Sequence, residues 1–289
     1  MDGVLAIVFA LATALSNAFA IAAQHAASVS GDPAHRGWTL LTYLMRHPLW
    51  LLGWLGMGAS LACQAIALHY GPLSLVQPIL VGELVLALVL RKLWLNQDLR
   101  TAAWVSATVT TVALISFLIA TNPRASTWTP TVRDWIWPSA AVALLVVIAS
   151  VTARRGTPAR RAGAYAGATA LLWALEATFI KATAAVLVAG GVSTMLARWP
   201  LYALIGCGVV GLLTEQAALH VGPLKISQPI IVIVDPLASI LLGVTLYHER
   251  LVTSPLTSAV AVISFVIVAV GVLAMTRTVP DTAHALHRR

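Results

Sequence analysis

Long apolar runs, separated by short polar stretches, dominate the chain. A helix needs roughly 20 apolar residues to cross a bilayer, and nine runs come close to that length. They cover residues 4–27, 49–70, 73–93, 102–121, 135–153, 163–187, 200–220, 224–246 and 255–276. With 59% hydrophobic and only 10% charged residues, the chain has too little polar surface for a water-soluble domain, which carries about 25% charged residues. We therefore predict an all-α integral membrane protein with about nine transmembrane helices.

The piece at residues 38–48 is apolar on one side but too short to cross a bilayer. We expect it to lie in the membrane interface. If it does cross, only the N-terminus and the first loop change sides, and the rest of the predicted arrangement is unaffected.

One stretch that leads into the third apolar run occurs twice. HYGPLSLVQPILVGE, from His69 to Glu83, returns as HVGPLKISQPIIVIVD, from His220 to Asp235. The two copies share the His, the Gly-Pro and the Gln-Pro in the same register, and each ends in an acid. A repeat of this length in an apolar chain indicates a duplicated membrane unit.

The number of spans predicts two inverted four-helix repeats joined by one linking helix. Four spans form a first repeat (1–121), one lies in a linker (122–162), four form a second repeat (163–276), and a polar tail follows (277–289). Because the linker crosses once, the second repeat enters the membrane from the opposite side, as in many secondary transporters. Most of the 18 Lys and Arg residues fall in loops on one side, which predicts a multi-pass protein of the cell membrane with a cytoplasmic C-terminus.

Each repeat also carries a loose motif around this stretch. The first copy holds Ala67-Leu68-His69-Tyr70, Pro78 and Asp98, and the second holds Ala218-Leu219-His220-Val221, Pro229 and Glu249. This resembles the EamA-like repeats of the drug/metabolite transporter (DMT) superfamily, in which an A-L-x-y pattern closes one helix and a helix with a central Pro and a following acid comes next. The resemblance covers nearly the whole chain and implies a transporter that works by alternating access.

Two further resemblances imply different cargo. The nine-span layout and the stretch YLMRHPLW, from Tyr43 to Trp50, are similar to the NIPA-type magnesium transporters. The four-helix unit also resembles the small multidrug resistance proteins, whose first helix carries a proton-binding Glu. In the second repeat Glu176 falls in that helix. The first likeness implies Mg²⁺ as cargo, and the second implies an organic solute exchanged for protons.

Three acids within apolar runs are the main candidates for a substrate or ion path. Glu83 and Asp235 lie near mid-membrane in matching places of the two copies, and Glu176 lies near the middle of its own run. A charge at the bilayer centre costs about 2.5–3.5 kcal/mol on insertion scales, so such acids are usually functional. The alternative is that each only pairs with a neighbouring helix. Lys181 is a further candidate, unless it extends to the interface, whereas Glu215 lies nearer a helix end, where solvation is favoured.

Prolines and amides accompany these acids. Pro78, Pro229 and Pro236 are expected to kink their helices, because proline removes a backbone hydrogen bond and frees a carbonyl. Such carbonyls would line a polar path together with three amide side chains, those of Gln77, Gln228 and Asn17. Kinks that merely shape the helices are the alternative. Freed carbonyls and carboxylates are also the ligands that Mg²⁺ prefers, in which case Glu83 and Asp235 would bind the metal.

The sequence favours a secondary transporter for a small metabolite or organic solute, coupled to protons. A NIPA-type Mg²⁺ transporter is the alternative, and an accessory or lipid-acting membrane protein are alternatives from other classes. No P-loop, HExxH or CxxC motif occurs, so we expect neither an enzyme nor a cofactor. The basic residues form no stripe interleaved with aromatics, so we expect no nucleic-acid partner. The inverted repeat permits a monomer or a homodimer in the lipid bilayer.

Overall fold

The computed structural model describes residues 2–29, 45–94, 101–222, 224–252 and 254–278. These residues are helical apart from short connections and one isolated bridge between Arg124 and Arg250. They form nine spans long and apolar enough to cross a membrane, which confirms the predicted all-α membrane protein. The helices are α1 (Asp2–Val29), α3 (Pro48–Tyr70), α4 (Leu73–Leu80), α5 (Glu83–Leu93), α6 (Thr101–Thr121), α7 (Val132–Thr152), α8 (Pro158–Ala197), α9 (Trp199–Val221), α10 (Leu224–Leu246) and α11 (Pro255–Thr278).

The two repeats are built from the same helix pairs. In the first, α1 packs along α3 and against α4 and α5, and in the second α8 packs along α9 and against α10. Matching glycines show the same close approach, because a Cβ atom at Gly71 would lie 2.6 Å from Cβ of Ala6, and one at Gly222 would lie 2.6 Å from Cβ of Ala162. The duplicated sequence therefore produces duplicated packing.

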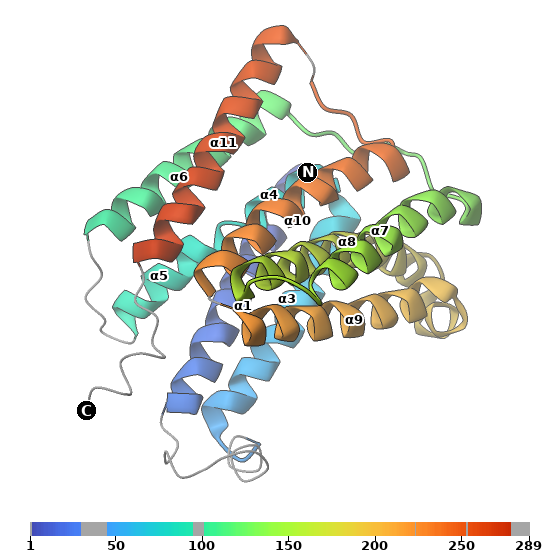
Figure 1. The fold of residues 1–289 in the computed structure, drawn as a ribbon. Coiled ribbons are helices and arrows are strands. Elements are labelled where there is room, and N and C mark those ends of the chain that lie inside the picture. Colours follow the sequence, from blue (N-terminus) through green and yellow to red (C-terminus); the bar gives the residue numbers. More distant parts are fainter. Residues whose placement is uncertain (1, 30–44, 95–100, 223, 253, 279–289) are drawn as a thin grey trace.

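The last helix of each repeat packs mainly on the other repeat. Figure 1 shows α6 and α11 side by side, apart from α9. They meet through an edge-to-face pair of Phe117 and Phe265, with ring centroids 5.8 Å apart. A buried cluster, Val81, Ala113, Val268 and Val272, joins them to the rest of the bundle. The helix α4 likewise contacts α10, and α3 contacts α8, so the two repeats also meet at these helices.

The predicted linking helix, α7, packs on α8 and touches α10. Its Trp135 stacks on Phe179 of α8 at 4.9 Å and meets Trp199 of α9 edge to face at 5.3 Å. Asp134 accepts hydrogen bonds from the backbone and hydroxyl of Thr131 and so closes the first turn. The linking helix therefore packs on the second repeat.

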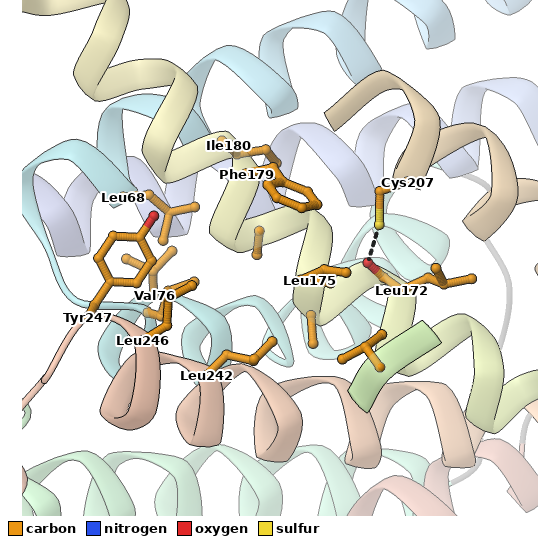
Figure 2. Close-up of a cluster of buried hydrophobic side chains, with 14 of the residues drawn as sticks. Leu68, Val76, Leu172, Leu175, Phe179, Ile180, Cys207, Leu242, Leu246 and Tyr247 are labelled. Atoms are coloured by element: carbon orange, nitrogen blue, oxygen red, sulfur yellow. Dashed lines mark hydrogen bonds between the residues drawn. The ribbon is translucent and has the colours of Figure 1, made fainter. Parts of the chain in front are cut away.

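The main apolar core lies where the repeats meet (Figure 2). Buried side chains of α8, including Leu172, Leu175, Phe179 and Ile180, face residues from α3, α4 and the end of α10, namely Leu68, Val76, Leu242, Leu246 and Tyr247. Cys207 of α9 donates from its thiol to the Leu172 carbonyl at 3.2 Å. Cys63 and Cys207 are both free thiols.

Two helices differ from the prediction. The single helix expected over 73–93 is interrupted at Val81 and Gly82, between α4 and α5. The helix expected over 163–187 is instead the 40-residue α8, which begins at Pro158 because the Thr157 hydroxyl caps it and proline suits a first turn. Near its end Gly191 has φ of 72°, a conformation that favours glycine, and the helix bends there.

Some predictions fall outside the described residues. They include most of the interfacial piece at 38–48, the acid Asp98 and the tail from residue 279 onward. The boundary expected between linker and second repeat at residue 162 now lies within α8. The prolines Pro229 and Pro236, which were expected to kink α10, lie inside one uninterrupted helix.

Candidate functional site

The interruption between α4 and α5 places Glu83 at the start of a half-helix. The Val81 and Gly82 amides donate to the carbonyls of Pro78 and Ile79 at 3.1 and 2.9 Å, and these tight turns replace the helical pattern. A Cβ atom at Gly82 would lie 3.0 Å from the Ile79 carbonyl oxygen, so the turn depends on a small residue. Glu83 then occupies the first turn of α5, where the free amide groups of the backbone favour a negative charge.

Asn17 of α1 is the direct partner of Glu83. Its side-chain amide donates to Oε2 of Glu83 at 2.5 Å, and both side chains are half-buried. The Glu83 carboxyl is thus oriented by a neutral group, which leaves its charge without a paired cation in this contact. The structure therefore brings together two residues that the sequence proposed separately for the path.

Asp235 contributes the matching acid from the second repeat. Its Oδ1 accepts a hydrogen bond from the Ser239 hydroxyl at 3.1 Å, one turn further along α10. The carboxyls of Asp235 and Glu83 are close enough for their charges to interact. Pro236, directly after Asp235, is buried.

Glu176 and Glu215 extend this group of charges. Glu176 of α8 interacts electrostatically with Asp235, and Glu215 of α9 interacts with Glu83. All four side chains are half-buried. We call Glu83, Glu176, Glu215 and Asp235 the acidic cluster. It draws on α5, α8, α9 and α10, and hence on both repeats.

The two repeats contribute unequally to the acidic cluster. A Cβ atom at Gly208 of α9 would lie 2.9 Å from Oε1 of Glu176, and one at Gly56 of α3 would lie 3.1 Å from Cβ of Ala20. Ala20 therefore occupies the place of Glu176 in the first repeat. The second repeat supplies a carboxyl where the first has a methyl group, so only one copy of this position carries charge.

The glutamines of the repeated stretch lie apart from these contacts. Gln77 is buried, and its side-chain nitrogen has no hydrogen-bond partner among the described residues. Gln228 is half-buried, and the prolines that follow them, Pro78 and Pro229, are fully buried. Their predicted place on a polar path remains a prediction.

Lys181 lies in an ion pair that the sequence analysis did not anticipate. Its ammonium group contacts Oε1 of Glu249 at 2.9 Å, with the carboxylate fully buried. Lys181 therefore pairs within the protein rather than extending to the interface. The sequence singled out Glu249 only through the resemblance to known repeats, because the residues that contact it are distant in the chain.

Among the residues that the structure describes, no three side chains of His, Cys, Asp or Glu gather as a metal ion would require. The acids of the cluster interact through charge across the helix interfaces. Buried negative charge of this kind is neutralised by protons or by a bound cation.

The comparisons with known proteins add one relative. The chain is 28% identical over 286 residues to a protein of Corynebacterium glutamicum described as uncharacterized, and the match covers 96% of each chain. No family model matches the chain. No solved structure matches it either.

Proposed function

We propose that this protein is a secondary transporter of the cell membrane, which moves a small organic solute by alternating access and is coupled to protons. The observation that supports the proposal best is the acidic cluster, which gathers half-buried carboxyls from both repeats beside an interrupted helix. Interrupted helices and charges at the repeat interface are the places where transporters with inverted repeats bind their cargo. The C-terminus would face the cytoplasm, in accordance with the distribution of Lys and Arg.

The proposed coupling uses Glu83 and Asp235 together. They belong to opposite repeats, so a movement of one repeat against the other changes the distance between the two charges. When the carboxyls separate or meet solvent, they release protons, and when they approach, one is neutralised. A cationic or polar solute that binds between them would replace the proton. Asn17, which donates to Glu83, would orient that carboxyl toward the exchange.

The proposal is tested in liposomes that hold the purified protein, a pH dye and a magnesium dye. The double variant Glu83→Gln, Asp235→Asn removes both carboxyls. We expect it to reduce solute-driven proton flux by about 100-fold, because the loss of a side chain that transfers protons has an effect of this size. Candidate solutes are added as mixtures of organic cations and metabolites. The half-buried acid Asp134, which caps α7 outside the cluster, provides the control Asp134→Asn, which makes the same atomic change and keeps an oxygen that can accept from Thr131, so it should leave flux unchanged.

The outcomes separate the functional classes. Flux that is lost in the double variant and kept in Asp134→Asn supports the proposal. Mg²⁺ entry that is lost in the same double variant would replace it with the cation-transport alternative. Normal flux in the double variant would show that the acidic cluster is not the coupling site. No flux of any kind in the unaltered protein would favour an accessory or lipid-related role.

A further inference from the structure

We infer that the ion pair between Lys181 and Glu249 is a gate that closes the outer side of the transport path. This inference rests on the proposed function and adds a named closing contact to it. The pair connects the two repeats, because Lys181 belongs to α8 and Glu249 follows α10, whereas the groups that they bind begin α4 of the first repeat. In the proposed orientation the end of α10 faces outward.

Glu249 binds the start of α4 through both of its oxygens. Oε1 accepts from the Leu73 amide at 2.7 Å and from Lys181 Nζ at 2.9 Å. Oε2 accepts from the amide and the hydroxyl of Ser74 at 3.0 and 2.8 Å. The carboxylate is therefore held by the free amides of a helix N-terminus and by a cation. A neutral side chain at position 249 would lose most of this attraction.

Lys181 holds the same junction from the other side. Its ammonium donates to the Gly71 carbonyl at 3.1 Å, just before α4. It also lies 4.8 Å from the centre of the Tyr247 ring, whose hydroxyl donates to the Thr178 carbonyl at 2.9 Å. One cation thus contacts the connection that enters α4 and the connection that leaves α10. Separation of the repeats at this end requires that these contacts break together.

The helix α4 links this contact to the acidic cluster. It has 8 residues, from Leu73 at the ion pair to Leu80 before the interruption, and spans about 12 Å. Glu83 follows the interruption directly. A short helix that joins the ion pair to the interruption before Glu83 can transmit a movement between them. A break in the contact at Glu249 would therefore change the position of Glu83.

A buried polar group on α4 offers a position at which opening of the gate can be detected. Gln77 is 3% exposed, and its side-chain nitrogen has no hydrogen-bond partner among the described residues. A buried donor without a partner costs about 1–3 kcal/mol, and such groups are rare in stable packing. Water that enters when α4 moves away from Glu249 would satisfy this amide. Gln77 therefore marks the surface that the gate covers.

Labelling of a cysteine at this position tests the inference. Cys63 and Cys207 are replaced by Ala, Gln77 by Cys, and a membrane-impermeant maleimide is added from outside. Because the labelling rate follows the population of the open form, Glu249→Gln is expected to raise it by about tenfold or more. Lys181→Arg keeps both charges but has a larger, planar head group, so it should raise the rate less than Glu249→Gln does.

A second reporter distinguishes a gate from general loosening. Thr110 on α6 is 1% exposed and lies against Met275 of α11, away from the ion pair. Faster labelling of Gln77→Cys with unchanged labelling of Thr110→Cys supports the gate. Equal labelling of Gln77→Cys with and without Glu249→Gln overturns it, and so does faster labelling at both positions. The readout needs no cargo, so absence of transport would contradict the proposed function without affecting this result.

Discussion

Replacement of Glu249 with Ala is expected to lower the free energy of unfolding by about 3–5 kcal/mol, the cost of leaving a buried charge without its partner. Lys181 is only 16% exposed and would keep its charge beside the Gly71 carbonyl and the Tyr247 ring. The start of α4 would also lose three hydrogen bonds, those from Leu73 and Ser74. Denaturant titration of the purified protein in detergent measures the change.

The matched control removes both charges at once. The double variant Lys181→Met, Glu249→Gln leaves no uncompensated cation, and the one amide oxygen of its Gln can still accept from an α4 amide. Because the two residues share one contact, the loss in the double variant should be smaller than the sum of the losses in Lys181→Met and Glu249→Gln measured singly. A strictly additive result would contradict the ion pair. An unchanged free energy of unfolding in Glu249→Ala would show that the pair adds nothing to stability.

Replacement of Gly222 with Val is expected to disrupt the junction between α9 and the start of α8. A Cβ atom there would lie 2.6 Å from Cβ of Ala162 and 2.7 Å from the Pro158 carbonyl oxygen. The second atom belongs to the backbone and cannot move aside by a rotamer change. Overpacking of this kind costs about 1–3 kcal/mol or more, and size-exclusion chromatography should show a smaller monodisperse fraction.

Gly206 provides the control for this change. It lies on the same α9, and a Cβ atom there meets nothing within 4 Å. Gly206→Val should elute like the parent protein. If Gly222→Val also elutes like the parent, the close approach of α8 and α9 at this point is not as tight as the structure has it.

The spans were predictable because bilayer thickness sets the length of an apolar run. The interruption at Val81 and Gly82 was not, because it lies within such a run and leaves the hydropathy unchanged. Its cause is local backbone geometry, in which amides turn back to Pro78 and Ile79. Pro78 indicated a distortion in this helix, but the helix continues for two residues after the proline and ends at Leu80.

The acids of the candidate site were predictable in part. The repeat located Glu83 and Asp235, and the structure brings their charges together. Glu215 was assigned to a solvated helix end, yet it interacts electrostatically with Glu83. Glu249 was missed as a site residue because its donors at Leu73 and Ser74 are 176 and 175 residues away in the chain. Only the packing of one repeat on the other brings them into contact.

The pairing of α6 with α11 bears on the order in which the chain is made. Membrane helices enter the bilayer as the ribosome produces them, and domains made first generally fold first. The main neighbour of α6 is the final helix, so α6 must remain in lipid with its α11-facing surface uncovered while α7 to α10 are synthesised. Thr110 and Phe117 lie on that surface. Because α6 packs on α11, the first repeat reaches its final packing only after α11 has been made.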